Sequence, residues 1–142
     1  MYSTLTLEDL GDFLETPHLG VLATFRRDGS PILSPVFWEW RDGGFLTPVF
    51  EGDFKLLHVK RDPRASIVVA EPSLPYRGIE VTGTAQIRTD PGRLERIRST
   101  NYRFCGKKAG EAMLEGQSEP TVYELRVEGK VRCWNLGALL GL

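Results

Sequence analysis

One lysine lies where a bound anion could be held. Lys55 follows Gly52-Asp53-Phe54 at the start of a short predicted helix, directly after a run of strands joined by tight turns. The free N–H groups at a helix start attract anions, and a cation at that place adds its own charge. The position of Lys55 therefore indicates a phosphate-bearing ligand laid along a sheet. By residue type alone, a lysine at a helix start is most often a solvated charge.

Residues suited to other chemistry are few. His18 and His58 stand in unrelated contexts, and the two cysteines, Cys105 and Cys133, are far apart in the sequence. This pattern favours neither a metal site nor a disulfide framework. The chain also lacks the glycine-rich motifs of Rossmann and P-loop nucleotide sites and the Gly-x-Ser-x-Gly elbow of serine hydrolases. We therefore expect no metal site and reduced thiols, and we assign no catalytic side chain.

Composition and charge limit the class of protein. The 142 residues are 41% hydrophobic and 26% charged, which is ordinary for a single globular domain. A formal net charge of −1 gives no general attraction for nucleic acid or an anionic membrane. No apolar run approaches transmembrane length, and Met1-Tyr2-Ser3-Thr4 does not begin like a signal peptide. We expect one cytoplasmic domain over residues 1–142.

The chain around Lys55 is predicted to consist mainly of strands joined by hairpin turns. Asp28-Gly29 and Asp42-Gly43 close tight turns because glycine takes positive φ without strain. Strands are predicted over 18–25, 31–40, 45–50, 65–70 and 79–88, and over 121–128 with 131–134 as a last hairpin or bent strand. The apolar run over 65–70 predicts a strand buried on both faces. Helices are predicted before Pro17, after Lys55, and over 91–99 and 107–115. Together these elements predict a mainly β fold, an antiparallel six-stranded barrel, closed or nearly closed, with short peripheral helices.

Short motifs occur in a fixed order along nearly the whole chain. They are Gly20-Val21-Leu22-Ala23-Thr24, Asp28-Gly29-Ser30-Pro31, Ser34-Pro35-Val36-Phe37-Trp38, Gly52-x-x-Lys55, Arg61-Asp62-Pro63-Arg64, Pro75-Tyr76-Arg77, Glu80-Val81-x-Gly83 and Val131-Arg132-x-Trp134-x-x-Gly137. In this order the sequence resembles the split β-barrel family related to pyridoxamine 5'-phosphate oxidase, in its flavin- and deazaflavin-dependent oxidoreductase branch. The resemblance implies the FMN-binding type of split barrel.

The resemblance also implies a cofactor site. Lys55 matches the basic residue that contacts the cofactor phosphate. Ser34-Pro35-Val36 and Thr47-Pro48-Val49 match two strand segments that line the cofactor ring. Arg77 stands at the family's Tyr-Arg position, and Trp134 lies in the segment that, in relatives, can close over the cofactor from the partner subunit. The resemblance thus implies a homodimer with two cofactor sites at the subunit interface.

The implied cofactor is FMN or the deazaflavin coenzyme F-420. The motifs Pro75-Tyr76-Arg77 and Trp134-Asn135-Leu136-Gly137 resemble the deazaflavin branch more than the oxidase branch. The implied activity is transfer of a hydride or electrons to a small conjugated organic acceptor. The cofactor carries the hydride, and the protein positions its ring and excludes water.

The sequence departs from the family beside the lysine. Glu51 and Asp53 are two carboxylates next to the implied phosphate site, and they would repel a doubly charged ligand. Pro48-Val49 stands where relatives often carry Ser-Thr, and Gly78 replaces a polar or aromatic residue. A non-catalytic carrier or sensor of flavin, haem or a tetrapyrrole on the same barrel is the alternative.

Other residues allow interpretations outside the cofactor site. Arg77 could pair with Glu71 or Glu80. The apolar side chains of Phe37, Trp38, Trp40 and Phe45 exceed what one small barrel encloses, which favours an isologous dimer.

A basic stretch near the second half of the chain suggests another function class. It contains Arg93, Arg96, Arg98, Arg103, Lys107 and Lys108, interleaved with Tyr102 and Phe104. Such a mixture is typical of single-stranded nucleic-acid surfaces. Three intervening or following carboxylates, Glu95, Glu111 and Glu115, favour instead a solvated helix face. We therefore expect a small-molecule substrate and no nucleic-acid or membrane partner.

Overall fold

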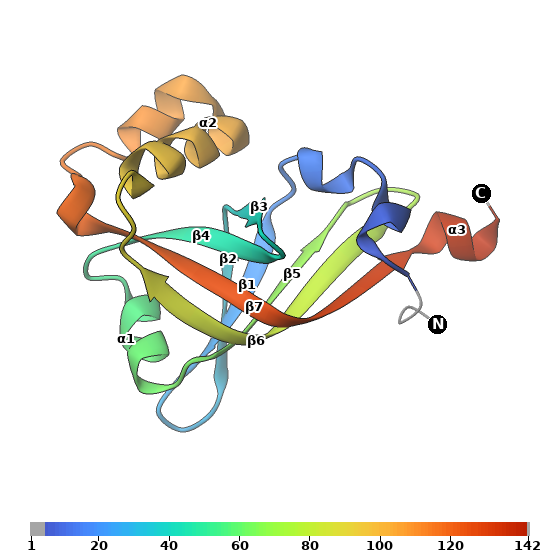
Figure 1. The fold of residues 1–142 in the computed structure, drawn as a ribbon, viewed down its shortest axis with the longest axis horizontal. Coiled ribbons are helices and arrows are strands. Elements are labelled where there is room, and N and C mark those ends of the chain that lie inside the picture. Colours follow the sequence, from blue (N-terminus) through green and yellow to red (C-terminus); the bar gives the residue numbers. More distant parts are fainter. Residues whose placement is uncertain (1–4, 142) are drawn as a thin grey trace.

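One antiparallel sheet forms the centre of the computed structural model, which describes residues 5–141. Its seven strands are β1 (Gly20–Phe25), β2 (Pro31–Val36), β3 (Glu39–Arg41), β4 (Gly44–Phe50), β5 (Arg64–Ala70), β6 (Arg77–Arg88) and β7 (Val122–Asn135). They lie in the order β2-β1-β5-β6-β7-β4-β3, and each neighbouring pair is antiparallel. The long strands β6 and β7 run side by side through the middle of the molecule (Figure 1). The predicted mainly β, split-barrel fold class is confirmed, with seven strands rather than six.

The additional strand comes from the segment predicted as one strand over 31–40. That segment is interrupted at Phe37 and Trp38, so β2 ends at Val36 and β3 pairs with β4. The Trp38 side chain is fully buried, and its indole N–H donates to the backbone oxygen of His18. Because β2 and β3 are the two edges of the sheet, one continuous segment borders both edges. No strand pairing between β2 and β3 closes the barrel within the described residues.

The main apolar core lies on one face of the curled sheet. Its fully buried members include Leu22, Trp38, Phe45, Ile67, Ile79, Val81, Leu125 and Val127. In β5, Ala65, Ile67 and Val69 are buried, whereas Ser66 and Val68 are only half-buried. The expectation of a strand buried on both faces is therefore wrong. An antiparallel sheet needs cover on one face only, so its strands alternate even where the sequence is apolar.

Three α-helices and several 3₁₀ turns surround the sheet. The helices are α1 (Phe54–Arg61), α2 (Arg93–Ala112) and α3 (Leu136–Leu140), and the predicted N-terminal helix is instead two 3₁₀ turns, Leu7–Leu10 and Phe13–Glu15. No helix within residues 5–141 is long and apolar enough to span a membrane. Met1-Tyr2-Ser3-Thr4, expected to carry no signal peptide, lies outside the described residues.

The helix α2 takes the place of two predicted helices. Its backbone is helical except at Gly106, where φ is 83° and ψ is 171°. A Cβ placed on Gly110 would lie 3.3 Å from the Cβ of Asn101, although nine residues of straight helix span about 13.5 Å. The chain therefore folds back at Gly106, and α2 consists of two short segments packed together (Figure 1).

Candidate functional site

The first turn of α1 fixes the position of Lys55. The Asp53 side chain caps this helix, because its Oδ1 accepts a hydrogen bond of 2.8 Å from the backbone N–H of Lys55. The same carboxylate pairs with the Lys55 ammonium, with Oδ2 3.0 Å from Nζ. The Lys55 Nζ also lies 4.8 Å from the centre of the Phe54 ring. The lysine is thus a partly buried cation held by an aspartate of its own helical turn.

A cavity of about 190 Å³ lies beside Lys55. Its walls come from the end of β2, from β4, from the start of α1 and from α2, and they are mostly apolar. The lining residues are Pro35, Val36, Phe37, Pro48, Phe50, Asp53, Lys55, Asn101 and Met113. The cavity brings together four of the nine predicted cofactor contacts, namely Lys55, Pro35, Val36 and Pro48.

Three predicted ring contacts do not line this cavity. Thr47 and Val49 are buried residues of β4, and their side chains lie on the opposite face from Pro48 because successive strand residues alternate. Ser34 is also buried, one position before Pro35 on β2. Strand alternation thus separates Thr47 and Val49 from the cavity, and Ser34 is not among its lining residues, although the next two residues, Pro35 and Val36, both line it. Contact of these three residues with a cofactor stays a prediction.

Arg77 lies in a separate ion-pair cluster. Its guanidinium donates to the carboxylate of Glu71 at 2.6 Å and to that of Asp12 at 2.8 Å. It also donates to the backbone oxygen of Leu10 at 2.9 Å. Of the two possible partners named from the sequence, Glu71 is confirmed, whereas Glu80 pairs with Arg132. These bonds tie the N-terminal 3₁₀ turn to β6, and Arg77 does not line the Lys55 cavity.

Trp134 lies near the end of β7, opposite Gly78 of β6. A Cβ added to Gly78 would approach two indole ring carbons to 2.3 Å, so the indole lies directly across this glycine. The close approach explains why a polar or aromatic side chain does not fit at position 78. Trp134 does not line the cavity, and its contact with a cofactor stays a prediction.

Two lining residues, Asn101 and Met113, were missed from the sequence. Asn101 is 1% exposed, and neither its Oδ1 nor its Nδ2 has a hydrogen-bond partner. It falls between the two helices predicted over 91–99 and 107–115, so it was assigned to no element. The signal that could have found it is Ile97, a buried residue four positions earlier on the same helix face.

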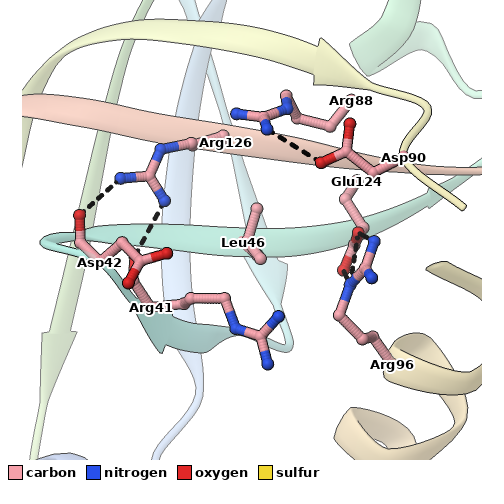
Figure 2. Close-up of a pocket in the computed structure, with 8 residues that line it drawn as sticks. All are labelled: Arg41, Asp42, Leu46, Arg88, Asp90, Arg96, Glu124 and Arg126. Carbon is pink, nitrogen blue, oxygen red and sulfur yellow. Dashed lines mark hydrogen bonds and ion pairs between the residues drawn. The ribbon is translucent and has the colours of Figure 1, made fainter. Parts of the chain in front are cut away.

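A larger cavity of about 310 Å³ is rich in arginine, but its charges are largely paired (Figure 2). The Arg96 guanidinium donates to the buried Glu124 carboxylate, with Nη2 2.7 Å and Nε 3.1 Å from Oε1. Arg88 pairs with Asp90 at 2.9 Å. The lining residues are Arg41, Asp42, Leu46, Arg88, Asp90, Arg96, Glu124 and Arg126. Because Leu46 is the sole apolar side chain among them, this cavity suits a flavin-type ring less than the one beside Lys55.

The basic stretch of α2 is similarly engaged with carboxylates. Arg93 contacts Glu119 at 3.5 Å and donates to nearby backbone oxygens, and Arg98 donates to Glu111 at 2.8 Å. With Arg96 held by Glu124, three arginines of the stretch have acidic partners. Their charges are therefore offset within the described structure, as expected of a solvated helix face.

The expectation that one barrel cannot enclose the large apolar side chains of the early strands is wrong for two of these residues. Trp38 and Phe45 are both fully buried by the chain itself. The Arg103 guanidinium lies 4.7 Å from the centre of a Trp38 ring, and the Phe104 ring meets Trp38 edge-on at 5.7 Å. The folded-back α2 therefore covers surface that the sequence suggested a second subunit would cover.

The family is shown by a match over most of the chain. A family model described as pyridoxamine 5'-phosphate oxidase matches residues 7–132. The chain belongs to the pyridoxamine 5'-phosphate oxidase family. The resemblance seen in the ordered motifs is thereby confirmed. No protein with curated function matches the sequence.

Solved structures share the fold of this family member. A conserved hypothetical protein from Mycobacterium tuberculosis is 24% identical with a TM-score of 0.77, covering 99% of this chain and 91% of that one. An F420 reductase is 23% identical with a TM-score of 0.63, covering 83% and 91%. A heme binding protein from Mycobacterium smegmatis is 22% identical with a TM-score of 0.59, covering 89% and 56%. At these identities the similarity establishes the split-barrel fold.

Proposed function

We propose that this chain is an oxidoreductase that binds FMN or F-420, with the cofactor phosphate at Lys55. One observation carries the proposal: Lys55, Pro35, Val36 and Pro48, which the family resemblance names independently, line one cavity. The similarity to an F420 reductase supports a flavin-type cofactor. The C-terminal motif around Trp134 favours the deazaflavin.

The residues at the cavity fit the needs of such a cofactor. A bound flavin or deazaflavin supplies the hydride chemistry. Lys55 offers a point charge for a phosphate, although the Asp53 side chain already accepts from its backbone N–H at the helix start. Pro48 and Phe50 exclude water, and Phe37 is stacked on Phe104 at a centroid distance of 4.6 Å, which gives a firm apolar wall. The acceptor in this proposal is a small conjugated organic molecule.

A second copy of the chain is part of the proposal. Val21 of β1 and Leu33 of β2 are 38% and 65% exposed, and β1 pairs with β2 so that Val21 lies opposite Pro35. These apolar residues form an exposed patch that continues to the cavity wall at Pro35. An isologous homodimer would bury this patch and place a partner beside the cavity. Sedimentation should then show a dimer at micromolar concentration, and a monomer would contradict this element.

A non-catalytic carrier is the second candidate function. Asp53 already offsets the charge of Lys55, which weakens attraction for a phosphate. One protein of similar fold is described as a heme binding protein, and the Met113 thioether, a possible haem ligand, lines the cavity. A carrier would bind its ligand without reducing or oxidising an acceptor.

Titration of the purified protein with FMN, F-420 and haemin, each followed by absorption, tests the proposal. We expect binding of FMN or F-420, and Lys55→Met should weaken it about tenfold, the loss of one charge-assisted contact. Lys60→Met, which removes an exposed charge from the same helix, is the matched control and should change little. Reduced bound cofactor should be reoxidised by a quinone or enone. Binding of haemin alone, without turnover, would support the carrier, and Lys55-independent cofactor binding would overturn the assigned site.

A further inference from the structure

Asn101 lines the cavity beside Lys55, and both polar groups of its side chain lack a partner. The residue is 1% exposed, yet both its carbonyl oxygen and its amide nitrogen lack a hydrogen-bond partner. Buried polar groups of this kind are nearly always paired, because leaving them unpaired costs free energy of folding. The amide therefore fits a position where a ligand, or the water that precedes it, completes the hydrogen bonds.

The fold holds Asn101 in place from two sides. Four residues earlier, Ile97 is fully buried in a small core with Leu114 and Val122. After the reversal at Gly106, the returning segment packs on the same turn, where a Cβ on Gly110 would lie 3.3 Å from the Cβ of Asn101. This packing fixes the helix position that carries the amide.

We propose that Asn101 and Lys55 together form a subsite for a phosphorylated polyol, the ribityl phosphate tail of the cofactor. This inference rests on the proposed function and assigns the part of the cofactor that enters the cavity. The amide offers two donors and an acceptor, and each polyol hydroxyl offers one donor and two acceptor lone pairs, so the two are complementary. Lys55 holds the phosphate at the end of the same tail.

The size of the cavity supports the tail rather than the ring. Pockets that enclose whole ligands of drug size measure about 300–1,000 Å³, whereas this cavity measures about 190 Å³. A tricyclic ring together with its tail exceeds that space. The ring would then extend from the Pro35 side of the cavity onto the apolar patch that Pro35 forms with Val21 and Leu33, next to the second subunit.

Three ligands that share one ring system test the contributions of the ribityl chain and of the phosphate separately. FMN carries the ribityl chain and the phosphate, riboflavin lacks the phosphate, and lumiflavin lacks the ribityl chain. We expect Asn101→Leu to weaken FMN and riboflavin about tenfold each and to leave lumiflavin unchanged. Lys55→Met should weaken FMN alone. If the protein prefers the deazaflavin, F-420 and its phosphate-free chromophore replace FMN and riboflavin.

Stability gives a readout that does not depend on bound cofactor. Replacing an unpartnered buried amide by a leucine of similar volume should leave the Tm of the ligand-free protein unchanged or raise it. Thr100→Val, the neighbouring buried polar residue that does not line this cavity, is the matched control and should leave ligand affinity unchanged.

The outcomes distinguish this inference from the proposed function. If Lys55→Met weakens FMN or F-420 while Asn101→Leu changes nothing, the cofactor site stands and the polyol subsite is wrong. Equal weakening of FMN and lumiflavin by Asn101→Leu would mean that the amide contacts the ring, which also overturns the inference. If the wild-type protein binds none of these ligands, the proposed function and this inference fail together.

Discussion

The Nζ of Lys55 lies 3.0 Å from the Oδ2 of Asp53, so the cation that could hold a phosphate is already paired within its own helical turn. The lysine side chain is 13% exposed and the aspartate side chain 25%. Solvent and salt therefore screen this ion pair less than they screen a pair on the open surface. A phosphate at Lys55 must share the ammonium with this carboxylate and meets its negative charge. Asp53 is thus the cap of α1 and would compete with a bound phosphate for the lysine.

Removing the competing charge should strengthen cofactor binding. Asn caps a helix about as well as Asp, so Asp53→Asn should keep α1 intact while freeing Lys55. We expect FMN or F-420 to bind about tenfold more tightly, as for the relief of one unfavourable charge contact. Fluorescence titration at low salt measures the change.

Glu51→Gln is the control for that substitution. It removes a neighbouring carboxylate that does not line the Lys55 cavity, so affinity should change much less. Weaker binding by Asp53→Asn would show that the carboxylate helps the ligand and would contradict the competitor role.

The buried pair in the arginine-rich cavity should be structural. Glu124 is 2% exposed, and Arg96 is its ion-pair partner at 2.7 Å. Arg96→Met would leave a buried carboxylate without its cation and should lower the free energy of unfolding by about 3–5 kcal/mol. Arg98→Met, which breaks a largely exposed pair on the same helix, should cost about 0–1 kcal/mol. Urea unfolding of both variants checks the contrast, and equal losses would show that Glu124 finds other stabilisation.

A side chain at position 78 should collide with the indole of Trp134. Because Gly78 does not have positive φ, an alanine there suffers from lack of space rather than from backbone strain. Gly78→Ala should lower the free energy of unfolding by about 1–3 kcal/mol, the usual cost of overpacking. Combined with Trp134→Leu, it should cost less than the sum of the two single changes. Strict additivity in thermal unfolding would mean that the ring moves aside freely.

Protonation of His58 should destabilise the fold. The Nδ1 of His58 lies 3.0 Å from the hydroxyl oxygen of Thr24, itself buried under α1. Burial, followed by the charges of Arg61 and Arg26, lowers the pKa of His58 below 6.5. The unfolded chain therefore binds the proton more readily, so this group costs no stability well above pH 6.5 and progressively more as the pH falls below that value.

His58→Gln should remove that part of the pH dependence. Urea midpoints measured between about pH 5 and 8 should fall toward acid more steeply for the wild type than for the variant. Parallel curves for wild type and His58→Gln would contradict the lowered pKa.

Much of the sheet follows from local signals. The Asp28-Gly29 and Asp42-Gly43 turns lie between paired strands as expected, and the alternation over 79–88 matches β6. The break at Phe37 and Trp38 does not follow, because burial of the indole against His18 is a tertiary contact that no short window reveals. The two helices predicted over 91–99 and 107–115 leave an unassigned interval, but neither the reversal at Gly106 nor the contact between Gly110 and Asn101 follows from the sequence.

The candidate site was predictable to a similar degree. Lys55 is predicted from its place at a helix start and Pro35 and Pro48 from family motifs, and the structure places all three beside one cavity. Thr47 and Val49 were expected beside Pro48, although strand alternation directs them elsewhere. The helical spacing from Ile97 could place Asn101 on the buried helix face, but only the packed structure shows that its side chain lacks hydrogen-bond partners.

The connection between β6 and β7 has a consequence for how such barrels diversify. The two strands pair directly, with Arg88 opposite Glu124, so the whole of α2 lies within one hairpin loop. That loop alone supplies Asn101 and Met113 to the cavity. Exchanging it would replace one wall of the pocket without shifting the register of a single strand. Changes in this loop alone could therefore alter which ligand such a protein binds, while the sheet and the helix α1 that carries Lys55 stay the same.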